Sequence, residues 1–206
     1  KYNMGSDDVV FALIDTGIMY DHEELDGRMV SAGYDFSEDG CADAYYDTSL
    51  AGSVYGHSTF IAGIVTNNPP DTVKILPYKV VPFGTTVATA SSIINAINDA
   101  VSRGATVINI SLTSSSSGTS FKNRGVCICA AAGNQSSEIN GIYPAGVDET
   151  ITVSALENDF ETFADFSNYG KYVDFCATGR KIVSLAPYSS DADSRYRKNS
   201  GTSFSS

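Results

Sequence analysis

Asp8-Val9-Val10-Phe11-Ala12-Leu13-Ile14 is a short apolar run without polar alternation, and it sets the architecture that we expect for the chain. Such runs are typical of parallel β-strands that are covered on both faces. The run ends at Asp15-Thr16-Gly17, whose residue types favour a turn. We therefore predict a buried strand that carries a carboxylate at its carboxyl end.

Further apolar runs alternate with helical patterns along the rest of the chain. The predicted strands cover residues 74–81, 106–112, 126–132, 150–156, 172–176 and 181–185. The predicted helices cover residues 57–66 and 86–103. The second helix has one apolar face, formed by Ile93, Ile94, Ile97 and Val101. Strands that alternate with helices predict an α/β fold with a mainly parallel sheet.

The length and charge of the chain narrow its class. A chain of 206 residues fits one domain with a single large core. Its 24 acidic and 13 basic residues give a net charge of −11, which argues against nucleic-acid partners and anionic membrane surfaces. No apolar run approaches the ~20 residues that span a bilayer, so membrane insertion is not expected. The chain starts at Lys1 without a signal pattern, and we expect it to be part of a longer precursor.

The four cysteines do not form the spacing of a small disulfide-stabilised domain. Cys127 and Cys129 lie in a predicted strand, where residues two apart share a face. A metal site would need further Cys or His residues at ligand spacing, and none is close in the sequence to this pair. We interpret the cysteines, with Cys41 and Cys176, as buried thiols.

Polar residues follow three of the predicted strands. Asp15, Ser111 and Asn134 lie at or just beyond strand ends, which meet at one edge of a parallel sheet. Asp15 could orient an imidazole, although Asp-Thr-Gly is also ordinary turn chemistry. The Asn134 amide could donate to an anion, although Gly-Asn is also a common turn signal.

The chain has two histidines, His22 and His57. His57 opens the first predicted helix, where the positive helix end opposes charging of the ring and favours a neutral base. Taken alone, such a histidine is more often structural. His22 lies in a polar stretch, and we expect it at the surface. A serine nucleophile would need a base of this kind, and small residues surround Ser203 near the end of the sequence.

Together and in this order, these segments resemble the subtilisin-like serine protease family. The chain order Asp, His, Ser is itself characteristic of subtilisin. The matching stretches span nearly the whole chain and are Val10–Ile18, Gly56–Val65, Val107–Leu112, Ala130–Asn134 and Ser200–Phe204.

The resemblance implies a single three-layer α/β domain over residues 1–206, with helices on both faces of the sheet. It implies that Ser203 is the nucleophile, His57 the general base and Asp15 its orienting partner. Asn134 and the Ser203 amide would form the oxyanion hole. Extended substrate would bind residues 111–113 and Gly133, with residues 84–86 as the opposing edge. These substrate-contacting residues are Ser111, Leu112, Thr113, Gly133, Gly84 and Thr85.

The implied activity is that of a serine endopeptidase that cleaves peptide or protein substrates through an acyl-enzyme. The family resemblance also implies an extracellular or cell-surface location, an N-terminal pro-segment outside this chain, and no required cofactor. A pseudoprotease that binds peptides without cleaving them is the alternative. A nucleotide-binding domain is disfavoured, because neither G-x-G-x-x-G nor G-x-x-x-x-G-K-[ST] follows any strand.

Several positions depart from the family pattern. Ser58 and Phe60 stand where the family has Gly and a second His, and the helices that follow the nucleophile in the family are absent after Ser206. Thr113 and Ile142 replace small residues at the specificity pocket, so we predict a preference for small apolar side chains.

The resemblance also bears on metal binding. Residues 67–71 are too short for the loop of the family's stronger calcium site, although Glu24 matches its acidic partner. We therefore expect no metal at that site, and at most a weaker structural calcium at the surface.

Overall fold

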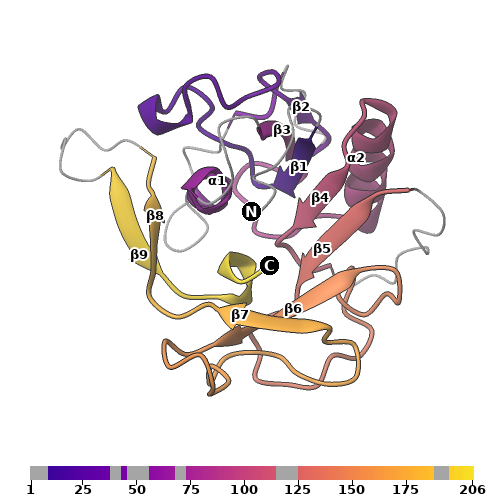
Figure 1. The fold of residues 1–206 in the computed structure, drawn as a ribbon. Coiled ribbons are helices and arrows are strands. Elements are labelled where there is room, and N and C mark those ends of the chain that lie inside the picture. Colours follow the sequence, from indigo (N-terminus) through magenta and orange to yellow (C-terminus); the bar gives the residue numbers. More distant parts are fainter. Residues whose placement is uncertain (1–8, 38–42, 46–55, 68–72, 115–124, 188–194) are drawn as a thin grey trace, which may run out of the picture.

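The protein's structure is a computed structural model that describes residues 9–37, 43–45, 56–67, 73–114, 125–187 and 195–206. Its centre is a parallel seven-stranded sheet with the order β2-β3-β1-β4-β5-β6-β7 (Figure 1). The strands are β1 (Val10–Asp15), β2 (Tyr34–Asp35), β3 (Lys74–Lys79), β4 (Val107–Ile110), β5 (Cys127–Ala131), β6 (Ile151–Leu156) and β7 (Phe175–Thr178). The predicted mainly parallel α/β architecture is confirmed.

Strand β1 pairs on both sides and carries Asp15 as its last residue. In the parallel register Asp15 lies beside Lys79 of β3, and Ile14 lies beside Ile110 of β4. Because the strands run in one direction, the segments that follow β1 and β4 leave the sheet at the same edge. This register therefore brings Asp15 and Ser111 to one rim.

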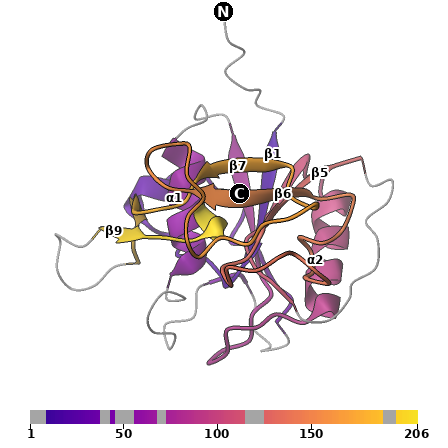
Figure 2. The same ribbon diagram turned by 90° about the horizontal axis from the view of Figure 1, so that it is seen from below.

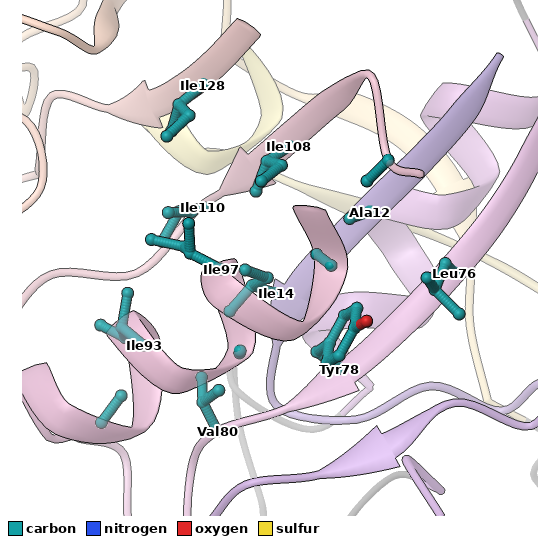
Figure 3. Packing of buried hydrophobic residues seen from close by; sticks show 14 of the residues in the cluster. Ala12, Ile14, Leu76, Tyr78, Val80, Ile93, Ile97, Ile108, Ile110 and Ile128 are labelled. Atoms are coloured by element: carbon teal, nitrogen blue, oxygen red, sulfur yellow. The ribbon is translucent and has the colours of Figure 1, made fainter. Parts of the chain in front are cut away.

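Helix α2 (Ala90–Ser102) covers one face of the sheet and builds the larger core. The Thr89 hydroxyl accepts a hydrogen bond from the backbone N–H of Ser92 and caps the helix start. Ile93 and Ile97 are fully buried and point toward the isoleucines of β4 and β5 (Figure 3). The apolar stripe read from the sequence is the face that packs.

Helix α1 (His57–Asn67) covers the opposite face, as Figure 2 shows. Phe60 and Ile61 join a second core with Leu13 of β1 and Ile75 of β3. Two helices on opposite faces of one sheet give the predicted three layers. Among the described residues, no helix is both long enough and apolar enough to cross a bilayer.

An antiparallel hairpin, β8 (Ile182–Leu185) with β9 (Tyr196–Asn199), lies against α1 (Figure 1). The Ser184 hydroxyl donates to the backbone O of Phe60 at 2.7 Å. A Cβ added to Gly63 would lie 2.3 Å from the Ser184 Oγ, so the close approach requires glycine there. The chain leaves β9 directly into the short helix η3 (Thr202–Phe204), which carries Ser203. The hairpin therefore holds the serine turn against the helix that begins with His57.

Some element boundaries differ from the predictions. Helix α2 begins at Ala90 instead of residue 86, because Thr89 provides the cap. Strand β7 covers residues 175–178, shifted from the predicted 172–176. Strands β2 and β9 had no apolar run to reveal them, and β9 reads Tyr-Arg-Lys-Asn.

Two predictions of burial were wrong. Cys127 and Cys176 are exposed and Cys129 is half-buried. In β5 only the alternate residues, such as Ile128, face the core under α2, whereas Cys176 lies on the edge strand β7. Cys41 lies outside the described residues. His22, expected at the surface, is only 1% exposed. Its Nδ1 accepts a hydrogen bond from the Glu24 N–H at 3.1 Å, so the ring caps the short helix η1 (Glu23–Leu25).

Candidate active site

Asp15 and His57 meet in a direct hydrogen bond at the rim of the sheet. The Asp15 Oδ1 lies 2.8 Å from the His57 Nδ1. The Asp15 side chain is fully buried, whereas that of His57 is 13% exposed. The same carboxylate oxygen accepts the backbone N–H of Thr16 at 2.7 Å. A buried carboxylate is stable only with such hydrogen-bond donors. Because one of these donors is the His57 ring, the contact also fixes the orientation of the imidazole.

Ser203 lies in the same cleft, at the start of η3. Its hydroxyl donates to the backbone O of Ser111 at 3.0 Å, and across the described chain no hydrogen bond joins it to His57. The Ser111 hydroxyl in turn lies 3.1 Å from the backbone O of Ser203. Reciprocal bonds thus tie the end of β4 to the serine turn. Transfer of a proton to His57 would require the Ser203 side chain to rotate away from Ser111.

Asn134 follows β5 and presents its side chain beside Ser203. Its Oδ1 accepts hydrogen bonds from the backbone N–H of Thr202 at 2.9 Å and from the Thr202 hydroxyl at 3.0 Å. A backbone N–H can only donate, so the oxygen of the amide must face Thr202. The Nδ2 group therefore points elsewhere and remains a donor for a ligand. The Thr202 Oγ1 also accepts the Gly133 N–H at 3.0 Å, which locks the two loops together.

A cavity of about 200 Å³ opens over these residues. Its lining includes His57, Asn134 and Ser203. Of the expected substrate-contacting residues, it also includes Ser111, Leu112, Thr113 and Gly133. Ile142, Gly84 and Thr85 are not among its lining residues, whereas Thr86 is. Gln135 and Asn199 line the cavity too and were not singled out from the sequence.

An aromatic pair stands beside the imidazole. The rings of Phe60 and Phe204 have centroids 4.5 Å apart, and the Phe204 ring lies 5.6 Å from that of His57. Both phenylalanines are buried. The departure from the family pattern at Phe60 is therefore accommodated by packing against Phe204, one residue after the serine.

Asn168 is a site residue that the sequence reasoning missed. It lies in the loop before β7 and is fully buried. Its side chain accepts the Gln135 N–H at 2.9 Å and donates to the backbone O of Ala132 at 2.9 Å. In the sequence, Asn168 stands in the segment Phe166-Ser167-Asn168, which cannot be distinguished from an ordinary loop by its residue types.

The expectations for calcium are only partly covered by the described residues. Most of the loop 67–71 lies outside them. Glu24 accepts a hydrogen bond from the Tyr196 hydroxyl, which raises the pKa of Tyr196. Within the described ranges, no three His, Cys, Asp or Glu side chains gather closely enough to hold a metal ion.

Comparison with known proteins gives consistent relatives. A model of the subtilase family matches residues 6–206. A thermophilic serine proteinase of Bacillus sp. (strain AK1) is 36% identical over 98% of this chain, and the halolysin-like extracellular serine protease Nep of Natrialba magadii is 33% identical over 98%. This chain spans 50% of the first relative and 38% of the second.

The structural comparison agrees. The crystal structure of a cold-adapted subtilisin-like serine proteinase superposes with a TM-score of 0.73 at 28% identity. The superposition covers 100% of this chain and 74% of that protein.

Proposed function

The chain belongs to the subtilase family, and from this we propose that the full-length protein is a serine endopeptidase that acts through an acyl-enzyme. The observation that carries the proposal is the 2.8 Å contact between Asp15 and His57 in the cleft that also holds Ser203. Acyl transfer by serine requires a carboxylate that orients an imidazole and a hydroxyl that can reach this imidazole, and the cleft contains all three groups.

The proton movements follow from the hydrogen bonds. Asp15 accepts a hydrogen bond from the Nδ1–H of His57 and so holds the proton on that nitrogen, which leaves the Nε2 as the basic nitrogen. The Ser203 side chain rotates from the Ser111 carbonyl toward this nitrogen when substrate binds. Catalytic hydrogen bonds are often long or poorly aligned before substrate binds, so the resting geometry is compatible with the role. His57 then takes the hydroxyl proton as Ser203 attacks the peptide carbonyl.

The Asn134 Nδ2 and the Ser203 backbone N–H stabilise the developing oxyanion. The Oδ1 of Asn134 accepts two hydrogen bonds from Thr202, so the direction of the Nδ2 donor is fixed before negative charge develops on the substrate oxygen. His57 next gives its proton to the leaving amine, and the acyl-enzyme forms. Water then attacks the ester while His57 takes its proton, and His57 returns this proton to the Ser203 oxygen as the ester bond breaks and the carboxylic acid product leaves.

The substrate would bind as an extended strand along residues 111–113. Thr113 lines the cavity, which supports a preference for a small side chain before the cleaved bond. Ile142, outside the lining, does not contribute to this argument. The chemistry uses side chains of the chain itself and assigns no step to calcium. An extracellular location is proposed by analogy with Nep, whose name states it, and an N-terminal pro-segment remains part of the proposal.

Labelling of the full-length protein with a fluorophosphonate tests the proposal. We expect covalent labelling and peptide hydrolysis, both lost in Ser203→Ala and His57→Ala. The matched control is Ser102→Ala, which removes an exposed serine hydroxyl on α2 and should leave labelling unchanged. A folded protein that binds peptides without labelling at Ser203 would instead identify a pseudoprotease.

A further inference from the structure

Asn168 makes an unusually complete set of contacts with the loop that carries Asn134. Its Oδ1 accepts from the backbone N–H groups of Gln135 and Ser137, at 2.9 and 3.2 Å. Its Nδ2 donates to the Ala132 backbone O at 2.9 Å and to the Gln135 Oε1 at 2.8 Å. Its own backbone N–H donates to the Gly133 O at 3.0 Å. One fully buried side chain thus holds the residues on both sides of Asn134.

Only a primary amide of this length fits these contacts. Two acceptors, on Ala132 and Gln135, face the Nδ2, and two backbone donors, on Gln135 and Ser137, face the Oδ1. An aspartate of the same shape would accept but not donate, and an alanine would leave buried polar groups unpaired.

The Asn168 side chain also explains why a glycine stands at position 133. Gly133 has a φ of +100°, and a Cβ placed there would lie 2.5 Å from the Asn168 Nδ2. The backbone before Asn134 therefore runs directly over the Asn168 amide. This arrangement requires glycine at position 133 and asparagine beneath it.

The segment that carries Asn168 is itself anchored. The Ser154 hydroxyl of β6 donates to the Asn168 backbone O at 2.7 Å. Arg180 forms ion pairs with Glu157 and Asp165, which brace the preceding part of the loop. The support for Asn134 therefore extends from β6 through Asn168.

Asn134 is held from two directions. Thr202 fixes its side-chain oxygen, and Asn168 fixes the backbone on either side of it. We propose that Asn168 is a positioning residue, which sets the direction of the Asn134 Nδ2 toward the oxyanion in the proposed peptidase. This inference rests on the proposed function, because it concerns the donor used in that reaction.

The test is a double-mutant cycle on the full-length protein with a chromogenic peptide substrate. Asn134→Ala should lower kcat by about 10²- to 10³-fold, a magnitude known for the corresponding donor in subtilisin, a protein of this family. Asn168→Ala should lower kcat by about 10- to 100-fold through misplacement of that donor, with KM changed much less. Since Asn168 acts through Asn134, adding Asn168→Ala to Asn134→Ala should cost less than about 3-fold more.

Tyr78→Phe is the matched control, because it removes one hydrogen bond to Asp99 under α2, and Tyr78 is not among the residues that line the cleft. It should leave kcat unchanged. Equal losses from Asn168→Ala with and without Asn134, or an unchanged kcat in a folded Asn168→Ala protein, would overturn the proposal.

Asn168→Asp provides a second variant that keeps the shape and removes only the donors, and it is judged by the same cycle. Failure of both variants to fold would assign Asn168 to folding alone and also overturn the proposal. If the unmodified protein neither labels nor hydrolyses peptides, the proposed function fails, whereas activity with an insensitive Asn168 removes only this inference.

Discussion

His22 is a buried histidine whose burial favours the neutral form of the ring. The Nδ1 accepts the Glu24 N–H, and the backbone of Ala186, directly after β8, acts to raise the pKa of the ring. Burial lowers the pKa of His22 below its ordinary value of 6.5, against the opposing influence of Ala186 and Glu24 and with a smaller lowering contribution from Arg195. The ring therefore stays neutral in the folded protein under conditions in which the unfolded chain would bind a proton.

The stability of the full-length protein should fall as the pH drops below 6.5. Below pH 6.5 the unfolded state binds a proton at His22 that the folded state does not bind, so the free energy of unfolding falls by at most about 1.4 kcal/mol per pH unit. Above pH 6.5 neither state binds this proton, and His22 makes its full contribution to stability. His22→Asn keeps an acceptor for the helix cap but does not titrate. Thermal unfolding between pH 5 and 8 should show a flatter profile for this variant. Parallel profiles would contradict the assignment.

Individual positions of the site could be proposed from the sequence through the family resemblance. Asp15 ends a buried run, which alone is also consistent with an ordinary turn, and its carboxylate lies 2.8 Å from the imidazole of His57. The rotamer of Ser203 was not predictable, because it depends on the Ser111 carbonyl, 92 residues away in the sequence. Asn168 was missed for the same reason, since its partners lie more than 30 residues earlier.

At the scale of elements, helix α2 owes its stability to one buried face. Ile97 is fully buried in the core, whereas Asn95 is exposed to solvent on the other side of the helix. Ile97→Ala should lower the free energy of unfolding by about 2–5 kcal/mol, because it removes buried methylenes and leaves a cavity. Asn95→Ala should change it by less than about 0.5 kcal/mol. Urea denaturation of the full-length variants measures both, and equal effects would refute the proposed packing.

Elements with a strong apolar period were placed well from the sequence. The α2 stripe packs against the core, with Ile93 and Ile97 buried and Ile94 and Val101 partly buried, and the run that forms β1 buries four of its six residues. Strand β9 was missed because its partner is β8 rather than the main sheet, and its side chains are largely exposed. The sequence pattern of β5 was read as buried on both faces, although the residues on its Cys127 face are partly open.

At the scale of the whole molecule, charge is the dominant long-range property. The net charge of −11 opposes compaction through self-repulsion. Dissolved salt screens such repulsion over about 10 Å at 0.1 M. This property concerns solubility and stability rather than the fold.

We therefore expect the melting temperature of the full-length protein to rise between low ionic strength and about 0.15 M salt. Scanning calorimetry in NaCl and in KCl at matched ionic strength distinguishes general screening, which gives equal increases, from binding of a particular cation. A melting temperature that falls with added salt would show that attractive ion pairs outweigh the repulsion.

The cleft draws on positions 15, 57 and 203, which are joined only through the folded sheet, α1 and the hairpin. A ribosome delivers these positions in that sequence, so the order along the chain becomes an order in time. The carboxylate emerges first, the ring follows, and the hydroxyl comes last. In the proposed peptidase, a nascent polypeptide therefore lacks the nucleophile through most of the synthesis of this region and acquires it only when nearly all of the region exists to restrain it.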